Sequence, residues 1–253
     1  MKTKTAMLLL GLILLAGTAA AKSAKPLHIG HRGARGLLDE NTLESLKKAE
    51  ALGVDLVEFD IQRTADGVFV IMHDETVDRT TDGTGPIDQM TLAQFQALKT
   101  KSGFTPPTLA EVLDWLAGND LGFILDFKVK DPAFARELVQ IIEDRGLLDR
   151  AVFESTLPKV AGEVEKIKPE AVTAVYPVSM PLMIFWAEKY HIDQNSYNYL
   201  FATPGQVLLS KATGHQVVVW TVNSRAKIKW FTWLKVDGIM TDDPNLFQPK
   251  AKK

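Results

Sequence analysis

The sequence predicts an α/β protein with a (β/α)8 TIM-type barrel and a small insertion after the strand that ends at His73. Three observations support this prediction. Short apolar or β-branched runs alternate with stretches of helical period from Pro26 onward, which is the pattern of repeated βα units. No linker rich in Pro, Gly or Ser interrupts the alternation. The strand candidates exceed by one the eight that such a barrel needs.

The strand candidates are short runs that end in polar residues. In chain order they are Leu27–Gly30, Val54–Ile61, Val68–His73, Leu121–Lys128, Ala151–Phe153, Ala171–Val175, His191–Asn195, Gln216–Val222 and Gly238–Thr241. Too few residues separate Asp60 from Val68 for a helix, and the Ala65–Asp66–Gly67 tripeptide is a turn signal. We therefore expect Val68–His73 to be the surplus strand, paired as a hairpin at the barrel mouth. Residues 74–101 then form the insertion over the same mouth.

Helical periodicity fills most of the gaps between these strands. The predicted helices are Thr42–Leu52, Leu92–Leu98, Leu109–Leu116, Pro132–Ile142, Pro158–Ile167, Pro181–Glu188, Pro204–Ala212 and Arg225–Leu234. Several begin at a proline or just after Ser, Thr or Asp, as helix starts do. Asp242 and Asp243, which follow the last strand, are expected to cap the next loop.

The first 21 residues have the pattern of a secretory signal peptide. Lys2 and Lys4 precede an apolar run that ends at Ala16, and small residues up to Ala21 supply a cleavage site. The run is shorter than the roughly 20 apolar residues that cross a bilayer. We expect a signal peptide over residues 1–21, a single barrel domain over 22–253, export to the periplasm or secretion, and no stable membrane insertion after cleavage.

The composition restricts the chemistry. With 29 Lys and Arg against 31 Asp and Glu, the formal charge is −2, so no global basic field exists to bind nucleic acid. Anionic ligands must be bound locally, and no protein partner is implied. Zero cysteines exclude thiolate catalysis and Fe–S clusters, which leaves carboxylates and five histidines as metal ligands.

Acidic residues lie where strands of a barrel end. Side chains alternate along a strand, so Glu58 and Asp60 share one side, as do Asp126 and Lys128. Two carboxylates side by side in a barrel mouth repel each other unless a cation neutralises them. With a third carboxylate they would form an oxygen-rich site for Ca²⁺ or Mg²⁺.

An ordered series of motifs extends over nearly all of the chain after residue 21. The motifs are HRG (31–33), ENT (40–42), EFD (58–60), TADG (64–67), HD (73–74), RTTDGTG (79–85), LDFK (125–128), WTVN (220–223) and DGIMTDDP (237–244). In this order they resemble the glycerophosphodiester phosphodiesterases, a branch of the phospholipase C-like phosphodiesterase barrels. The resemblance implies metal-dependent hydrolysis of glycerophosphodiesters to sn-glycerol 3-phosphate and an alcohol.

The resemblance also implies roles for individual residues. His31 and His73 take the positions of the general acid and base, without indicating which is which. Arg32 and Lys128 match the positions that hold the substrate phosphate. Trp220 belongs either to the core or to the wall of the glycerol pocket. The nucleophile is either the glycerol 2-hydroxyl, which gives a cyclic phosphate, or water.

The metal ligands implied by the resemblance are Glu58, Asp60 and Asp126. The family usually has a glutamate at the third position, and the aspartate is shorter by one methylene. Glu154 is an alternative ligand, but Ser155 matches a mouth-lining serine, which predicts that Glu154 faces away from the mouth.

Two alternative functions remain open. A barrel of the same ancestry can act on lysophospholipids, as a lysophospholipase D does, or on another phosphodiester, and Met90, Phe95 and Leu98 of the insertion would then face an acyl chain or merely pack. A catalytically silent protein that binds phosphate esters is the second alternative. Both histidines and both basic residues are present, which argues against the silent protein.

Overall fold

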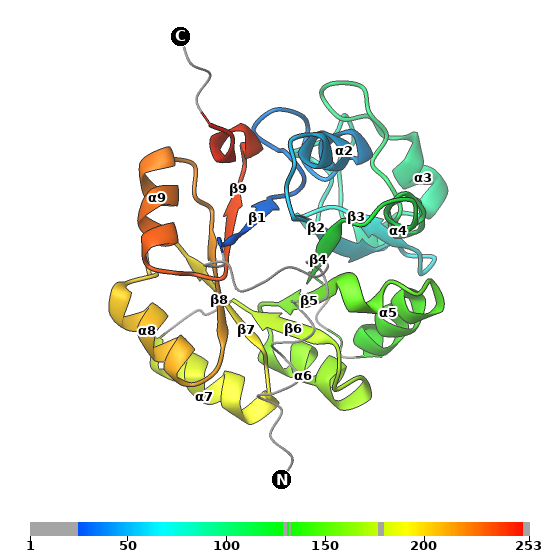
Figure 1. Ribbon diagram of the computed structural model, residues 1–253. Helices are drawn as coiled ribbons and strands as arrows, with labels where there is room; N and C mark the ends of the chain where they lie inside the picture. The colour runs from blue at the N-terminus through cyan, green and yellow to red at the C-terminus, as the bar shows by residue number, and fades with distance from the viewer. Residues whose placement is uncertain (1–24, 129–130, 132, 177–179, 250–253) are drawn as a thin grey trace.

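The computed structural model describes residues 25–128, 131, 133–176 and 180–249, and it confirms the predicted barrel (Figure 1). Eight parallel strands close in the order β1-β2-β4-β5-β6-β7-β8-β9, with β9 returning to β1. The strands of the sheet are β1 Leu27–Gly30, β2 Leu56–Arg63, β3 Phe69–Ile71, β4 Gly122–Phe127, β5 Ala151–Ser155, β6 Val172–Val175, β7 Gln194–Asn198, β8 Gln216–Trp220 and β9 Gly238–Thr241.

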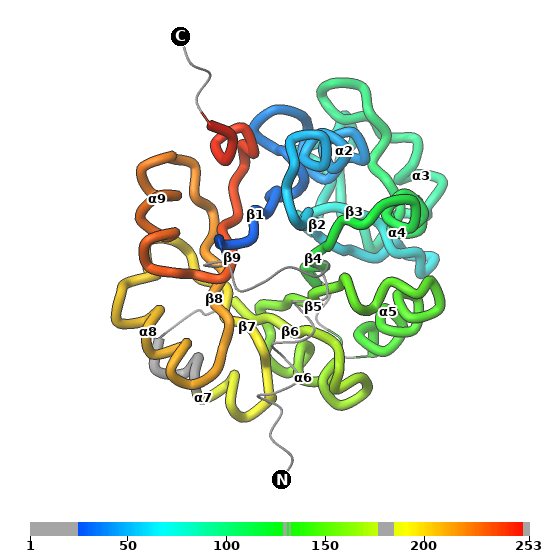
Figure 2. Tube along the Cα trace, in the orientation of Figure 1, coloured from blue at the N-terminus to red at the C-terminus, as the bar shows by residue number. Residues whose placement is uncertain are grey.

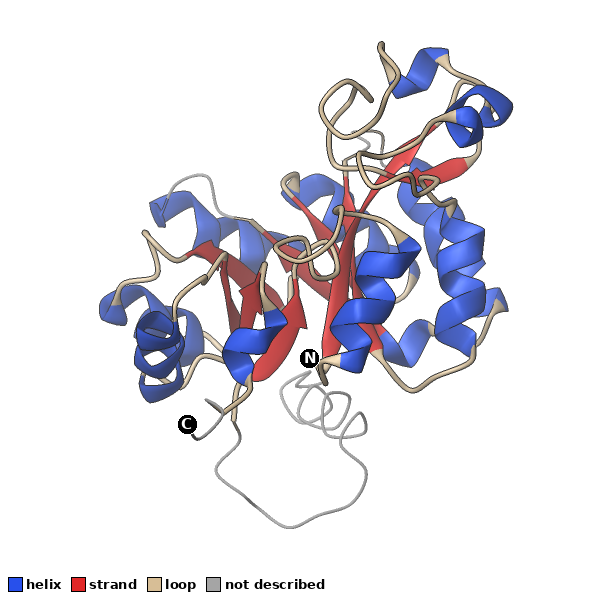
Figure 3. Cartoon of the chain, turned by 90° about the horizontal axis from the view of Figure 1, so that it is seen from above, coloured by secondary structure: helices blue, strands red, loops and turns tan. Residues whose placement is uncertain are grey.

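Helices surround the strands, as the tube in Figure 2 and the perpendicular view in Figure 3 show. They are α2 Leu43–Ala51, α3 Leu92–Ala97, α4 Leu109–Ala117, α5 Ala133–Asp144, α6 Pro158–Ile167, α7 Met180–Tyr190, α8 Pro204–Ala212 and α9 Arg225–Trp233. Thr91, Thr108 and Thr203 each form a capping box before a helix, and α6 and α8 begin with proline. These local signals explain why the predicted starts of these helices are accurate. The start predicted at Pro132 lies outside the described residues.

Strand β7 begins three residues later than predicted, the largest such difference among the strands. We expected a strand from His191, but β7 starts at Gln194. His191 has a left-handed backbone (φ 57°), and the Asp193 carboxylate accepts a hydrogen bond from the Thr173 backbone N–H. Residues 191–193 therefore follow α7 as a loop, although their composition resembles that of a strand.

The hairpin prediction is correct. Strand β3 pairs antiparallel with β2, with Ile61 opposite Ile71 and Arg63 opposite Phe69. The following insertion has its own small core, in which Phe95 is fully buried and Met90 and Leu98 pack around it. These three side chains therefore pack within the insertion, which removes the sequence argument for an acyl-chain site there.

Alternation along the strands separates two apolar layers. Leu56, Ile124 and Val152 belong to a cluster inside the barrel, whereas Val57, Leu125 and Phe153 pack under the helices. The same alternation turns the polar residues that follow toward the barrel mouth. The predicted signal peptide falls outside the described residues. Among those that are described, no helix combines the length and apolarity that a bilayer span requires.

Candidate active site

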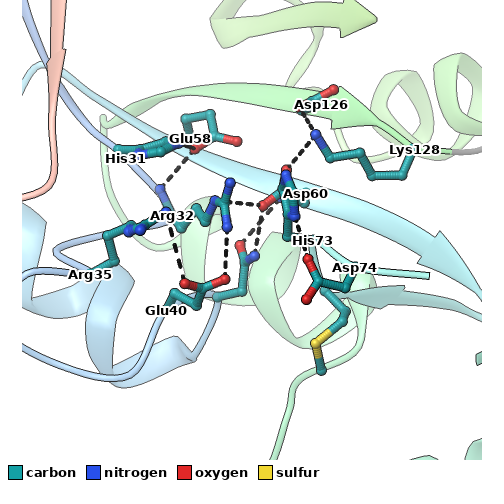
Figure 4. Close-up of polar contacts among 12 residues, drawn as sticks. His31, Arg32, Arg35, Glu40, Glu58, Asp60, His73, Asp74, Asp126 and Lys128 are labelled. Atoms are coloured by element: carbon teal, nitrogen blue, oxygen red, sulfur yellow. Dashed lines mark hydrogen bonds and ion pairs between the residues drawn. The ribbon is translucent and has the colours of Figure 1, made fainter. Parts of the chain in front are cut away.

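Three buried carboxylates meet at the carboxyl ends of the barrel strands (Figure 4). Glu58 and Asp60 come from β2, and Asp126 comes from β4, where it pairs in register with Asp60. One oxygen of each lies within 4.8 Å of the others, and each residue is 1% exposed. The predicted cluster therefore exists, and we call it the acidic triad.

The triad holds more negative charge than its surroundings neutralise. Burial, and then repulsion from Asp60 and Asp126, raises the pKa of Glu58 well above its ordinary value. Burial would also raise the pKa of Asp60, but the Lys128 ammonium and the Arg32 guanidinium keep it low. Lys128 Nζ lies 2.9 Å from Asp60 Oδ1 and also bonds Asp126. A single ammonium group therefore forms ion pairs with two carboxylates.

The donor set suits a divalent cation. All three side chains offer carboxylate oxygens, which Ca²⁺ and Mg²⁺ prefer. Asp126 Oδ1 is buried without a hydrogen-bond partner among the described residues. Burial raises the pKa of Asp126 to about 6, with Lys128 opposing and Asp60 adding to the rise. A cation beside the triad would give Asp126 Oδ1 a partner and reduce the repulsion among the three carboxylates.

The two predicted histidines lie on either side of the triad, each oriented by its own carboxylate. His31 Nδ1 lies 2.6 Å from Asp242 Oδ1, and its Nε2 lies 4.0 Å from Glu58 Oε2. His73 Nδ1 lies 2.6 Å from Asp74 Oδ1. Burial lowers the pKa of both imidazoles, while these carboxylates oppose the shift. Each ring is therefore held through its Nδ1, and His31 has its Nε2 on the side of Glu58.

The HRG loop brings Arg32 over the triad. Arg32 has a positive φ of 48°, and its backbone N–H donates to Glu58 Oε2 at 2.7 Å. Its Nε lies 3.3 Å from Asp60 Oδ2. Asn41, from the ENT motif, donates its amide N–H to the same Asp60 oxygen at 2.7 Å. The loop therefore fixes the triad and aims a guanidinium at it.

A charged network, which the sequence did not predict, connects the insertion with the mouth. Arg79 donates to both oxygens of Asp74 (2.5 and 3.1 Å) and to both oxygens of Glu40 (3.1 and 2.6 Å). Glu40 also accepts from Arg32 Nη1 at 2.8 Å. Arg79 thus orients the carboxylate behind His73 and the carboxylate beside Arg32. The motifs contained these residues but gave them no partners.

The prediction for Asp242 was wrong, and the prediction for Asp243 was right. Asp243 caps the short 3-10 helix Pro244–Phe247 by accepting from the Asn245 N–H at 3.0 Å. Asp242 instead accepts from Asn223 at 2.6 Å and holds His31. Two adjacent aspartates after a strand both resemble caps in a sequence, and only the fold separates their directions.

The prediction for Glu154 was also wrong. Val152 faces the barrel interior, so Glu154, two residues later, does too, and it pairs in register with Asp126. It is fully buried, and burial together with Asp126 raises its pKa to about 8. Ser155 occupies the other face, where its hydroxyl accepts from the Leu157 N–H. The motif match at Ser155 outweighed the strand parity that gives the correct side.

Trp220 ends β8 at the mouth and is only partly buried. Its indole N–H donates to the Ser196 carbonyl at 3.1 Å, and its ring meets Tyr176 edge to face with 5.2 Å between centroids. Tyr176 in turn donates its hydroxyl to Asp126 Oδ2 at 2.8 Å. Trp220 therefore packs on the interior cluster and lies close to the triad through Tyr176.

Known proteins resemble the chain along most of its length. A sequence model described as the glycerophosphoryl diester phosphodiesterase family matches residues 31–246. A glycerophosphodiester phosphodiesterase of Caldanaerobacter subterraneus is 31% identical, over 87% of this chain and 95% of that protein. Its Bacillus subtilis counterpart is 28% identical, over 90% and 86%. A solved phosphodiesterase of Oleispira antarctica, in complex with the product sn-glycerol-3-phosphate, is 27% identical and superposes with a TM-score of 0.83 over 88% and 96%.

Proposed function

The chain belongs to the glycerophosphoryl diester phosphodiesterase family, and from this premise we propose that it hydrolyses glycerophosphodiesters to sn-glycerol 3-phosphate and an alcohol with the help of a divalent cation. The observation that carries the proposal is the acidic triad with a carboxylate-oriented histidine on either side of it. A site that only bound phosphate esters would need basic groups and no such pair of imidazoles.

His31 and His73 are proposed to move the protons of the reaction. One neutral imidazole accepts the proton of the nucleophile, and the other, protonated, donates to the leaving alkoxide. Asp242 and Asp74 hold the two Nδ1 atoms, which leaves Nε2 as the ring nitrogen that would exchange the proton. Both imidazoles have pKa values lowered by burial, which favours the neutral form needed by the base.

Arg32 and Lys128 are proposed to bind the nonbridging oxygens of the phosphodiester. The Arg32 guanidinium and the Lys128 ammonium both lie at the triad. Attack on phosphorus increases the negative charge on the nonbridging oxygens, which these two groups would stabilise. Glu58, Asp60 and Asp126 would hold the cation, Ca²⁺ or Mg²⁺, which supplies Lewis-acid stabilisation of the same charge. Trp220 is proposed to form a wall of the glycerol pocket beside Tyr176.

One assay tests this proposal. Purified protein lacking residues 1–21 is given glycerophosphocholine, with release of glycerol 3-phosphate as the readout. We expect turnover that a chelator abolishes and that Ca²⁺ or Mg²⁺ restores. A parallel arm with lysophosphatidylcholine measures the alternative substrate class. Tight binding of glycerophosphocholine without turnover would overturn the proposal in favour of a binding protein.

Arg79 provides a test of how the site is positioned. Arg79 orients both Asp74 and Glu40. Arg79→Gln should therefore lower kcat by about 10-fold, which is the usual effect of losing a residue that holds a site side chain in place. The matched control is Arg136→Gln, which removes an exposed arginine paired with Glu163 on the outer helices. Equal rates in the two variants would show that the insertion does not position the site.

We also propose that the protein is exported to the periplasm or secreted. The support is the pattern of residues 1–21, with lysines, a short apolar run and small residues in order. Amino-terminal sequencing of the protein from the extracellular or periplasmic fraction tests this proposal, with a new terminus after Ala21 expected. An intact terminus at Met1 would contradict it.

A further inference from the structure

One quarter of the barrel has an unusual charge composition. The chain has 31 Asp and Glu residues, yet none lies between Asp193 and Asp237. This segment forms β7, α8, β8 and α9 and contains five Lys and Arg residues, which are Lys211, Arg225, Lys227, Lys229 and Lys235. Lys211 pairs with Asp237 at 2.9 Å, so the excess positive charge lies in Arg225, Lys227, Lys229 and Lys235. A protein of net charge −2 therefore carries a locally basic surface at α9.

The same quarter exposes most of the large apolar side chains that face solvent. Among the described residues, nine large hydrophobic side chains are exposed, and six of them lie here: Leu200, Phe201, Leu208, Leu209, Trp230 and Trp233. Leu208 and Trp233 are each 69% exposed. Trp230 and Trp233 stack on each other with 5.0 Å between ring centroids. A concentration of exposed apolar side chains is typical of an interaction site.

These residues belong to one continuous part of the molecule. Helices α8 and α9 are neighbours around the barrel (Figures 1 and 2), and Val207 of α8 and Phe231 of α9 share one core cluster beneath them. Lys227 of α9 places its ammonium 3.7 Å from the Tyr199 ring centroid, in the loop that carries Leu200 and Phe201. The helices and this loop together form what we call the α8–α9 surface.

We propose that the α8–α9 surface docks the protein on an anionic lipid bilayer. Tryptophan and leucine side chains enter the boundary between head groups and acyl chains, and lysines beside them meet lipid phosphates. Exposed Lys227 and Lys229 lie on the same helix as the two tryptophans. No carboxylate of α8 or α9 would be driven against the lipid charge.

A second copy of the chain fits this surface less well. In a twofold dimer the same surface occurs on both subunits, so two sets of lysines would be brought into one interface in which α8 and α9 supply no carboxylate. A bilayer offers opposite charge together with an apolar layer, and matches both features. Leu200 and Phe201 follow the carboxyl end of β7, the same end of the barrel that holds the acidic triad. Docking through them brings the barrel mouth close to the lipid.

Vesicle co-sedimentation tests the inference. We expect protein lacking residues 1–21 to bind phosphatidylcholine vesicles that contain phosphatidylglycerol, more weakly without that lipid and more weakly in high salt. Lys227→Glu with Lys229→Glu, and separately Leu208→Ser with Trp233→Ser, should each lower the partition coefficient by about 10-fold or more. The control for the lysine variant is Lys166→Glu, at an exposed lysine of α6. The control for the apolar variant is Phe185→Ser on α7, where the Phe185 side chain is 55% exposed.

Each result decides for or against the inference. Circular dichroism and turnover of a soluble glycerophosphodiester should be the same in all the variants, because none of these residues touches the site, so a failure of the catalytic proposal would be seen separately. Absence of binding to anionic vesicles would overturn the inference, as would equal binding by the variants and the controls. A stable dimer that Leu208→Ser with Trp233→Ser dissociates, without vesicle binding, would assign the surface to a second copy.

Discussion

Replacing His31 or His73 with glutamine is expected to lower glycerophosphocholine turnover by at least about 100-fold, the usual scale of a lost general acid or base. Both rings lie beside the triad with Nδ1 on a carboxylate, and glutamine cannot exchange a proton in this way. The control is His215→Gln. That histidine is also buried, but it hydrogen-bonds Thr213 and lies outside the site. Unchanged turnover in either site variant would refute its catalytic role.

The pH dependence identifies which ring is the base. Asp242 raises the pKa of His31, so Asp242→Asn should lower that pKa further. If His31 is the base, the acid limb of kcat/KM moves to lower pH, because the ring stays neutral further into acid. If His31 is the acid, the alkaline limb moves to lower pH, because the ring loses its proton sooner. Asp74→Asn applies the same test to His73.

Strand parity predicted which residues of a strand share a side, and the resemblance to a known family supplied the histidines and Arg32. Glu58 and Asp60, two residues apart, face one side, and so do Asp126 and Lys128. Parity with Val152 gives the correct side for Glu154, but the prediction relied on the motif match of Ser155 instead and was wrong. The start of β7 was missed because a left-handed residue, His191, ends the preceding helix, and local composition does not encode that conformation.

The contacts behind the histidines could not be predicted, because they join distant parts of the chain. Asp242 reaches His31 across 211 positions, and Arg79 reaches Glu40 across 39. The contact between Asp242 and His31 depends on the pairing of β9 with β1 that closes the barrel. The contact between Arg79 and Glu40 depends on how the insertion folds over the mouth. Periodicity specifies the side of a strand that a residue occupies, but not which loop of another strand meets it.

The acidic triad predicts opposite effects of one substitution with and without a cation. The pKa of Glu58 is higher in the folded protein than in the unfolded chain. Such a carboxyl lowers the free energy of unfolding once the pH rises above its pKa in the unfolded chain. In chelator at pH 7, Glu58→Gln should therefore melt higher than the unaltered protein, by at least about 3 °C. The amide oxygen of the introduced glutamine can still accept the Arg32 N–H, so the loop keeps its hydrogen bond.

With Ca²⁺ or Mg²⁺ the order should reverse. A ligand at a hundredfold excess over its Kd stabilises the folded chain by about 2.7 kcal/mol. Glu58→Gln removes a charged ligand and should lose most of that gain, together with at least about 100-fold of turnover. The control is Glu165→Gln on α6, a buried glutamate bonded to Thr173, which should keep the full gain. If the cation raises the melting temperature equally in both variants, the triad does not hold it, because the binding energy would not depend on the Glu58 charge.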